Sequence, residues 1–123
     1  MEDLVTQAKH FYKEGYRLTD LKHYDEAIEN YSKAIDLIPG FYEAIDNRAF
    51  CKMDMGRWKE AIDDFRLSLM INPKSFVAEF SIGECYLKSG EYKSAVNQFE
   101  KAIEIDPSQQ IAHDFLKNAK EKI

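Results

Sequence analysis

The run Tyr24-Asp25-Glu26-Ala27-Ile28 returns as Trp58-Lys59-Glu60-Ala61-Ile62, and after the same interval again as Tyr92-Lys93-Ser94-Ala95-Val96. The three prolines of the chain, Pro39, Pro73 and Pro107, keep this repeat interval. A fixed interval of this length is typical of repeated units that each contain a pair of helices and bury a core between neighbours. Such a chain favours an extended binding surface over a catalytic pocket.

Each unit contains two apolar patterns at helical spacing, separated by a short break at Lys22, Gly56 or Gly90. The residue just past a helix end favours the left-handed conformation, which glycine adopts without steric cost. We therefore expect a strained or differently closed turn at Lys22, at a cost of about 1 kcal/mol. The prolines end the second helices, because proline has no N–H to donate and biases its predecessor away from helix.

Small and aromatic residues follow the same interval and predict how the two helices of a unit pack. The small positions are Gly15, Ala49 and Gly83 in the first helices and Ala27, Ala61 and Ala95 in the second. They allow the paired backbones to approach closely. Tyr31, Phe65 and Phe99 lie four positions after the alanines, on the same helical face, and fill the space beside this contact.

Together these positions resemble the tetratricopeptide repeat family, whose pattern is aromatic, small, aromatic, small and proline at these offsets. The resemblance implies an all-α, right-handed superhelical solenoid of antiparallel helix pairs, with about seven helices. It divides residues 1–123, taken as a single domain, into repeats 8–41, 42–75 and 76–109. Residues 109–123 keep the first-helix pattern and are expected to form a capping helix with a polar outer face.

Composition sets further bounds. The chain has 123 residues, 45% of them hydrophobic, and a net charge of −5. It has no secretion signal at its N-terminus and no apolar run of membrane-spanning length, so we expect a cytoplasmic protein. Cys51 and Cys85 are separated by one repeat interval. They are expected to be buried as free thiols, because equivalent residues of neighbouring packed helices lie too far apart for a disulfide.

Nothing in the sequence predicts an enzyme or a cofactor. The three histidines, His10, His23 and His113, have no metal-ligand spacing to one another or to a cysteine. The acidic pair Asp63-Asp64 is expected to place one member in solvent, since adjacent helical residues point about 100° apart. Acids interspersed with lysines, and the negative net charge, argue against nucleic-acid binding.

The resemblance places the binding site in a concave groove built mainly from the first helices. The predicted groove residues are Tyr12, Tyr16, Glu43, Asp46, Asn47, Phe50, Asp54, Val77, Phe80, Ser81 and Glu84. The aromatic residues among them are not required by the packing pattern, and exposed apolar groups on one face indicate a partner. We expect a protein segment with apolar and basic side chains, and we expect the Asn47 amide to bind its backbone.

One subclass of the family binds the carboxylate at the end of chaperone tails through five groove positions. In this chain Asn47 matches one position, while the other four carry Tyr12, Tyr16, Val77 and Ser81. A carboxylate requires positive donors, so we expect no such clamp. The alternative to peptide binding is self-association through the terminal helix or the groove of another copy, and the chain is expected to be a monomer or a weak homodimer.

Overall fold

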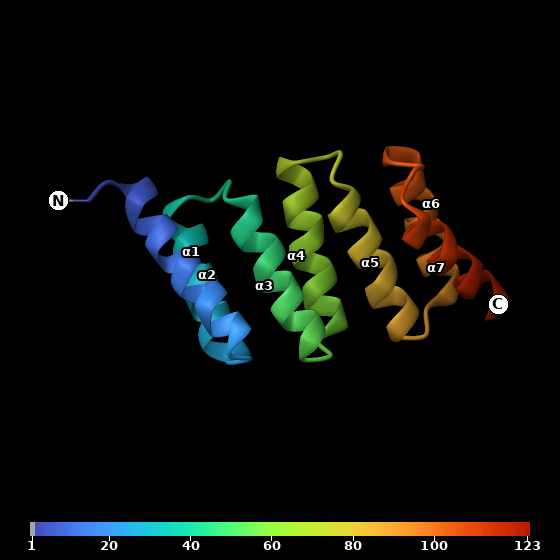
Figure 1. Cartoon of the computed structure of the whole chain (residues 1–123), viewed down its shortest axis with the longest axis horizontal. Coiled ribbons are helices and arrows are strands. Elements are labelled where there is room, and N and C mark those ends of the chain that lie inside the picture. The colour runs from blue at the N-terminus through green and yellow to red at the C-terminus, as the bar shows by residue number, and fades with distance from the viewer. Residues whose placement is uncertain (1) are drawn as a thin grey trace.

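The computed structural model describes residues 2–123, and Met1 lies outside the described residues. Within this range the chain forms seven α-helices and no strands. The helices follow one another in a row from the N-terminus to the C-terminus (Figure 1). The helices are α1 (Leu4–Asp20), α2 (Tyr24–Leu37), α3 (Tyr42–Asp54), α4 (Trp58–Ile71), α5 (Phe76–Lys88), α6 (Tyr92–Ile105) and α7 (Gln110–Glu121). The expected all-α solenoid is confirmed.

The main contacts join helices that are consecutive in the chain, so the core is divided into clusters along the row. Tyr31, Phe65 and Phe99 are each fully buried, one in each of three clusters. The predicted small contact points are confirmed, because a Cβ atom added at Gly15 would lie 2.7 Å from the Tyr31 ring and one at Gly83 would lie 2.5 Å from the Phe99 ring. In the first and third pairs, these glycines allow the second helix to press its ring against the first.

The turns within the three helix pairs are closed in the same way. Lys22, Gly56 and Gly90 have φ angles of 61°, 75° and 84°. In each turn the N–H of the next residue donates to a carbonyl five residues back at 2.9 Å, as His23 does to Leu18. The expected strain at Lys22 is confirmed, since a residue with a Cβ is in the left-handed region. The expectation of a different closure is wrong, because the hydrogen bond of the turn forms without glycine.

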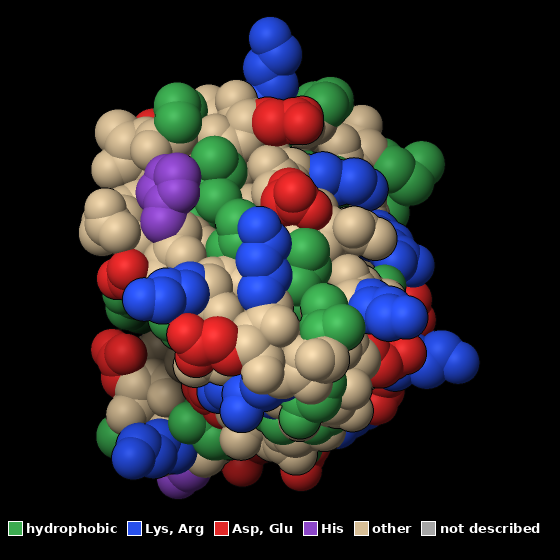
Figure 2. Space-filling model, turned by 90° about the vertical axis from the view of Figure 1, so that its right-hand side faces the viewer, with side chains coloured by type: hydrophobic (Ala, Val, Ile, Leu, Met, Phe, Trp, Pro, Cys, Tyr) green, Lys and Arg blue, Asp and Glu red, His purple; other side chains and the backbone are tan. Residues whose placement is uncertain are grey.

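α7 packs on the last helix pair and changes the pattern at one position. Ala112 and Ala119 are buried, and Phe115 packs against the cluster around Phe99. Lys117 stands one repeat interval after Gly83. In the first and third pairs this position holds glycine, because the aromatic ring of the second helix lies against it. α7 therefore cannot receive a ring as α1 and α5 do. Figure 2 shows the end face of the molecule, where basic and acidic side chains surround apolar ones.

Candidate peptide-binding groove

Tyr12 and Asn47 join the first two helix pairs on the first-helix side. The Asn47 amide nitrogen, on α3, donates to the Tyr12 hydroxyl, on α1, over 2.8 Å. The Tyr12 ring stacks on Phe41 with centroids 5.0 Å apart. Burial raises the pKa of Tyr12, although the hydrogen bond from Asn47 lowers it. Two predicted groove residues therefore contact one another, and one N–H of the Asn47 amide is already engaged.

A hollow of about 310 Å³ lies beside this pair. It is lined by Lys9, Tyr12, Lys13, Phe41 and Glu43. Sequence reasoning missed Phe41, which directly precedes α3. A signal was present, since the equivalent residues of the next two units are the polar Ser75 and Gln109. An aromatic residue at a position that is otherwise polar marks a departure from the repeat.

The remaining apolar groove residues differ widely in exposure. Tyr16 is 54% exposed and Val77 48% exposed, so both are available to a partner. Phe50 is half-buried. Its ring contacts the Phe65 ring edge to face, with the two centroids 5.2 Å apart. Tyr16 and Val77 therefore carry most of the exposed apolar surface among the predicted residues.

The expectation that Phe80 and Ser81 are exposed in the groove is wrong. Phe80 is only 8% exposed and Ser81 2%. The Phe80 ring stacks on Phe76 and contacts the rings of Phe99 and Phe115 at 5.5 and 5.1 Å. The physical reason is that α7 follows the third helix pair and brings Phe115 over this site. Phe80 is thus a core residue of the last cluster.

The predicted carboxylates form an exposed and a half-buried group. Glu43 and Asp54 are exposed, whereas Asp46 and Glu84 are half-buried. Burial raises the pKa of Asp46 and of Glu84, and for Glu84 the nearby Lys88 opposes the effect. The ion pairs within residues 2–123 involve neither of the two, and Asp46 Oδ1 is buried without a hydrogen-bond partner there. Asp46 therefore has no cation beside it among the described residues, whereas Lys88 lies near Glu84.

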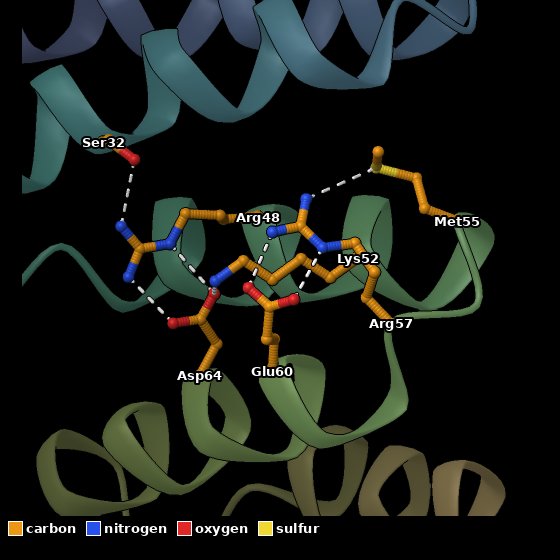
Figure 3. Close-up of polar contacts among 7 residues, drawn as sticks. All are labelled: Ser32, Arg48, Lys52, Met55, Arg57, Glu60 and Asp64. Atoms are coloured by element: carbon orange, nitrogen blue, oxygen red, sulfur yellow. Dashed lines mark hydrogen bonds and ion pairs between the residues drawn. The ribbon is translucent and has the colours of Figure 1, made fainter. Parts of the chain in front are cut away.

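The acidic pair Asp63-Asp64 is divided as expected, with Asp63 exposed and Asp64 buried. Asp64 accepts two hydrogen bonds from Arg48, at 2.9 and 2.8 Å, and pairs with Lys52 at 2.9 Å (Figure 3). Arg48 also donates to Ser32 on α2 over 3.1 Å. The cluster ties α3 to both α2 and α4. Every charged group in it has a partner. Its ion pairs join α3 to α4 within the second unit, and the hydrogen bond from Arg48 to Ser32 links that unit to the first.

The two cysteines are free and buried, as predicted. Burial raises the pKa of the Cys51 thiol, and it raises that of Cys85 to about 12. Both thiols are therefore protonated at neutral pH and are poor nucleophiles. Among residues 2–123 no cluster of three or more His, Cys, Asp or Glu side chains could hold a metal ion. Over the same range, no helix has the length and apolar character needed to cross a membrane.

Solved structures with the same arrangement of helices confirm the fold. The tetratricopeptide domain of Arabidopsis OM64 is 21% identical, with a TM-score of 0.91 over 98% of this chain and 99% of that one. The first such domain of Spaghetti (RPAP3), bound to the HSP90 peptide SRMEEVD, is 22% identical, with a TM-score of 0.89 over 95% and 93%. The Yersinia enterocolitica secretion chaperone SycD, in complex with a peptide of the translocator YopD, is 18% identical, with a TM-score of 0.87 over 93% and 92%.

No curated protein matches the sequence. Models of the tetratricopeptide repeat match residues 8–41 and 76–109. These ranges contain the buried rings Tyr31 and Phe99, which recur at the repeat interval and press on Gly15 and Gly83. Sequence, packing and structural likeness agree, and the chain belongs to the tetratricopeptide repeat family.

Proposed function

We propose that this protein is a non-enzymatic scaffold that binds a segment of another protein along its first-helix groove. The hollow beside Tyr12 and Phe41 carries the proposal, because it offers two stacked rings to an apolar side chain of a partner. Tyr16 and Val77 extend the apolar contact. Structural relatives that hold peptides of HSP90 or of YopD support a protein partner.

We further propose that the bound segment carries a basic side chain. Asp46 and Glu84 are half-buried, and neither belongs to an ion pair within residues 2–123. A lysine or arginine of the partner would neutralise a carboxylate that the fold leaves without a cation. The hollow itself is lined by Lys9 and Lys13 together with Glu43, and the two lysines would favour an acidic residue of the segment beside them.

An acidic chaperone tail is not the proposed ligand. Tyr12, Tyr16, Val77 and Ser81 replace four of the five carboxylate-binding positions, Ser81 is buried, and Asn47 is bonded to Tyr12. A labelled SRMEEVD peptide is therefore expected to show no saturable change in fluorescence anisotropy. Saturable binding that is lost on changing Asn47 to alanine would refute this part of the proposal.

The function is tested with a random peptide library displayed on phage and selected against the full chain. Selected peptides should combine apolar and basic residues and should bind the double variant Tyr16→Ala, Val77→Ser about tenfold more weakly or worse. Leu4→Ser, another exposed apolar position, is the matched control and should leave binding unchanged. Peptides that bind the double variant as tightly as the native chain would contradict the proposal.

Self-association through α7 is the second candidate. The exposed Ile111 and Ile123 support it, together with a pocket of about 380 Å³ beside Leu116 and Lys117. Light scattering of the full chain and of the variant Ile111→Ser, Ile123→Ser decides the matter. If the mass of the native chain rises with concentration and that of the variant does not, the result supports association through α7. If the native chain and the variant have the same mass at every concentration, the result argues against it.

A further inference from the structure

The outer face of α4 differs from the equivalent faces of α2 and α6. Leu67 stands where the other two units carry Lys33 and Lys101, and Met70 stands where they carry Asp36 and Glu104. Met70 is 81% exposed and Leu67 38%. The first and third units thus carry a basic and an acidic residue at these two positions, and the central unit carries two exposed apolar residues instead. Such a replacement on a solvent-facing helix surface indicates a contact with another molecule.

A pocket of about 470 Å³ lies on the same side, between α4 and the α5–α6 turn. Trp58, Ile62 and Tyr86 provide its apolar walls, and Ser89 lies beside them. Arg66 donates to the Tyr86 hydroxyl over 2.6 Å, and the Lys88 ammonium lies 5.7 Å from the Trp58 ring centroid. These contacts hold two of the walls in place.

Ser89 is the departure from the repeat that accounts for this pocket. The equivalent residues are Leu21, Met55 and Ile123, all apolar. The backbone is unchanged, with φ and ψ of −82° and −1° at Leu21, −90° and 0° at Met55, and −88° and 1° at Ser89. The side chain of Ser89 is shorter than those of Leu21, Met55 and Ile123, so it fills less of this space, which suits an unbranched apolar group such as that of methionine.

The charges at the rim favour an uncharged occupant. Lys59 and Arg66 are balanced by Asp63 and Glu91. Lys59, Asp63, Arg66 and Met70 follow one another at helical spacing, so they lie along one face of α4. An exposed methionine and a pocket of matching character thus share one helix face, as a self-complementary surface requires.

We propose that two copies of this chain pair through the outer faces of their α4 helices, with Met70 of each copy in the pocket beside Ser89 of the other. Antiparallel α4 helices with a two-fold axis near Arg66 place Met70 opposite Ile62 of the second copy. The same arrangement places the two Arg66 side chains beside each other at the axis. Each lies within one helical turn of Asp63 of the other copy, and these carboxylates offset the repulsion between the two arginines. The interface is isologous and closes at two copies.

One helix face on one helix face is a small interface, below the roughly 1,200 Å² that stable complexes bury, so the dimer is weak and reversible. The outer face of α4 does not include the predicted groove residues, all of which lie on α1, α3 and α5. Each dimer therefore presents two free grooves. Pairing does not depend on the function proposed above.

Sedimentation of the full chain from about 10 μM to about 1 mM tests the pairing. Two variants restore the residue that another unit carries: Met70→Glu, as at position 104, and Ser89→Met, as at position 55. Each should raise the dimer dissociation constant about tenfold or more. The control Val5→Glu changes an exposed apolar residue of α1 and should leave the constant unchanged.

Trp58 is the only tryptophan of the chain and lines the pocket, so its fluorescence should change on dimerisation in the native chain but not in Met70→Glu. Helical circular dichroism checks the folding of each variant, and Ser89→Leu, with the residue of position 21, replaces Ser89→Met if the latter does not fold. A monomer at every concentration overturns the proposal. So does a dimer that withstands both Met70→Glu and Ser89→Met, or one that Val5→Glu weakens as much as they do.

Discussion

At the scale of single residues, burial decides which predicted groove positions remain available to a partner. Tyr16 and Val77 are exposed, whereas Phe80 is held among three other rings. Asp46 stands one repeat interval after Tyr12 and one before Phe80, so a carboxylate replaces an aromatic ring in the central unit. A half-buried charge there has a cost in stability, which can be measured.

Changing Asp46 to asparagine should raise the free energy of unfolding by about 1 kcal/mol at pH 7. Burial raises the pKa of Asp46 in the folded state, so ionisation stabilises the unfolded chain more than the folded one. Native stability therefore falls as the pH rises through the folded-state pKa, and the gain from asparagine should disappear in acid. Urea denaturation of both proteins from acidic pH to pH 7 measures how the difference in stability changes. Asp36→Asn, at an exposed position, should show none, and a loss of stability at pH 7 in Asp46→Asn would contradict the argument.

Changing Gly83 to alanine should lower the free energy of unfolding by about 2 kcal/mol. The added Cβ would lie 2.5 Å from the Phe99 ring, which is fully buried and cannot move away freely. Thermal denaturation gives the difference. Gly40→Ala is the matched control, since its Cβ would have nothing within 4 Å, and equal effects of the two changes would show that Gly83 is not a packing contact.

At the scale of the elements, the first helix of each pair ends in the same way. One residue adopts the left-handed conformation, and the N–H of the next residue closes the turn with a hydrogen bond. The repeat interval predicted this turn as well as the helices, because turn and helix packing both depend on residues within one unit. Lys22 adopts the required φ of 61° although it has a Cβ. The closing hydrogen bond therefore outweighs the local strain.

Changing Lys22 to glycine should stabilise the protein by about 1 kcal/mol, because glycine adopts positive φ without the contact between Cβ and the backbone. The reverse change, Gly56→Lys, should destabilise it by a similar amount. Chemical denaturation of both variants measures the pair of effects. If both changes shift stability in the same direction, strain at the turn is not the cause.

At the scale of the whole molecule, the sequence predicted what repeats and could not predict what departs from the repeat. The helices, the small contact points and the buried rings follow from positions that recur. The burial of Phe80 depends on Phe115, which belongs to α7, and the pairing of Asp64 depends on Arg48, which belongs to α3. Such contacts form between elements, and a one-dimensional pattern does not contain their geometry. Phe41, Ser89 and Met70 were detectable only as exceptions to the interval.

Asp64 pairs with Arg48 and Lys52 within the second unit, and Arg48 in turn bonds Ser32 of the first unit, so removing this acid should weaken both contacts. Asp64→Ala leaves Arg48 and Lys52 without their carboxylate, and we expect a loss of about 2 kcal/mol in the free energy of unfolding. Urea denaturation measures the loss, and hydrogen exchange should show the largest increase in α2, α3 and α4. Glu100→Ala, at an exposed position, is the control. An exchange increase confined to α6 and α7 would contradict a coupling role.

The division of the core into clusters also determines when the chain can fold. The buried residues around Tyr31 extend from Ala8 to Cys51, those around Phe65 from Ala49 to Cys85, and those around Phe99 from Phe80 to Ala119. Such short sequence separations give a low contact order and rapid folding. During synthesis, the first cluster is complete once Cys51 has left the ribosome. We expect each new unit to pack on the unit before it, so that little apolar surface stays exposed during synthesis.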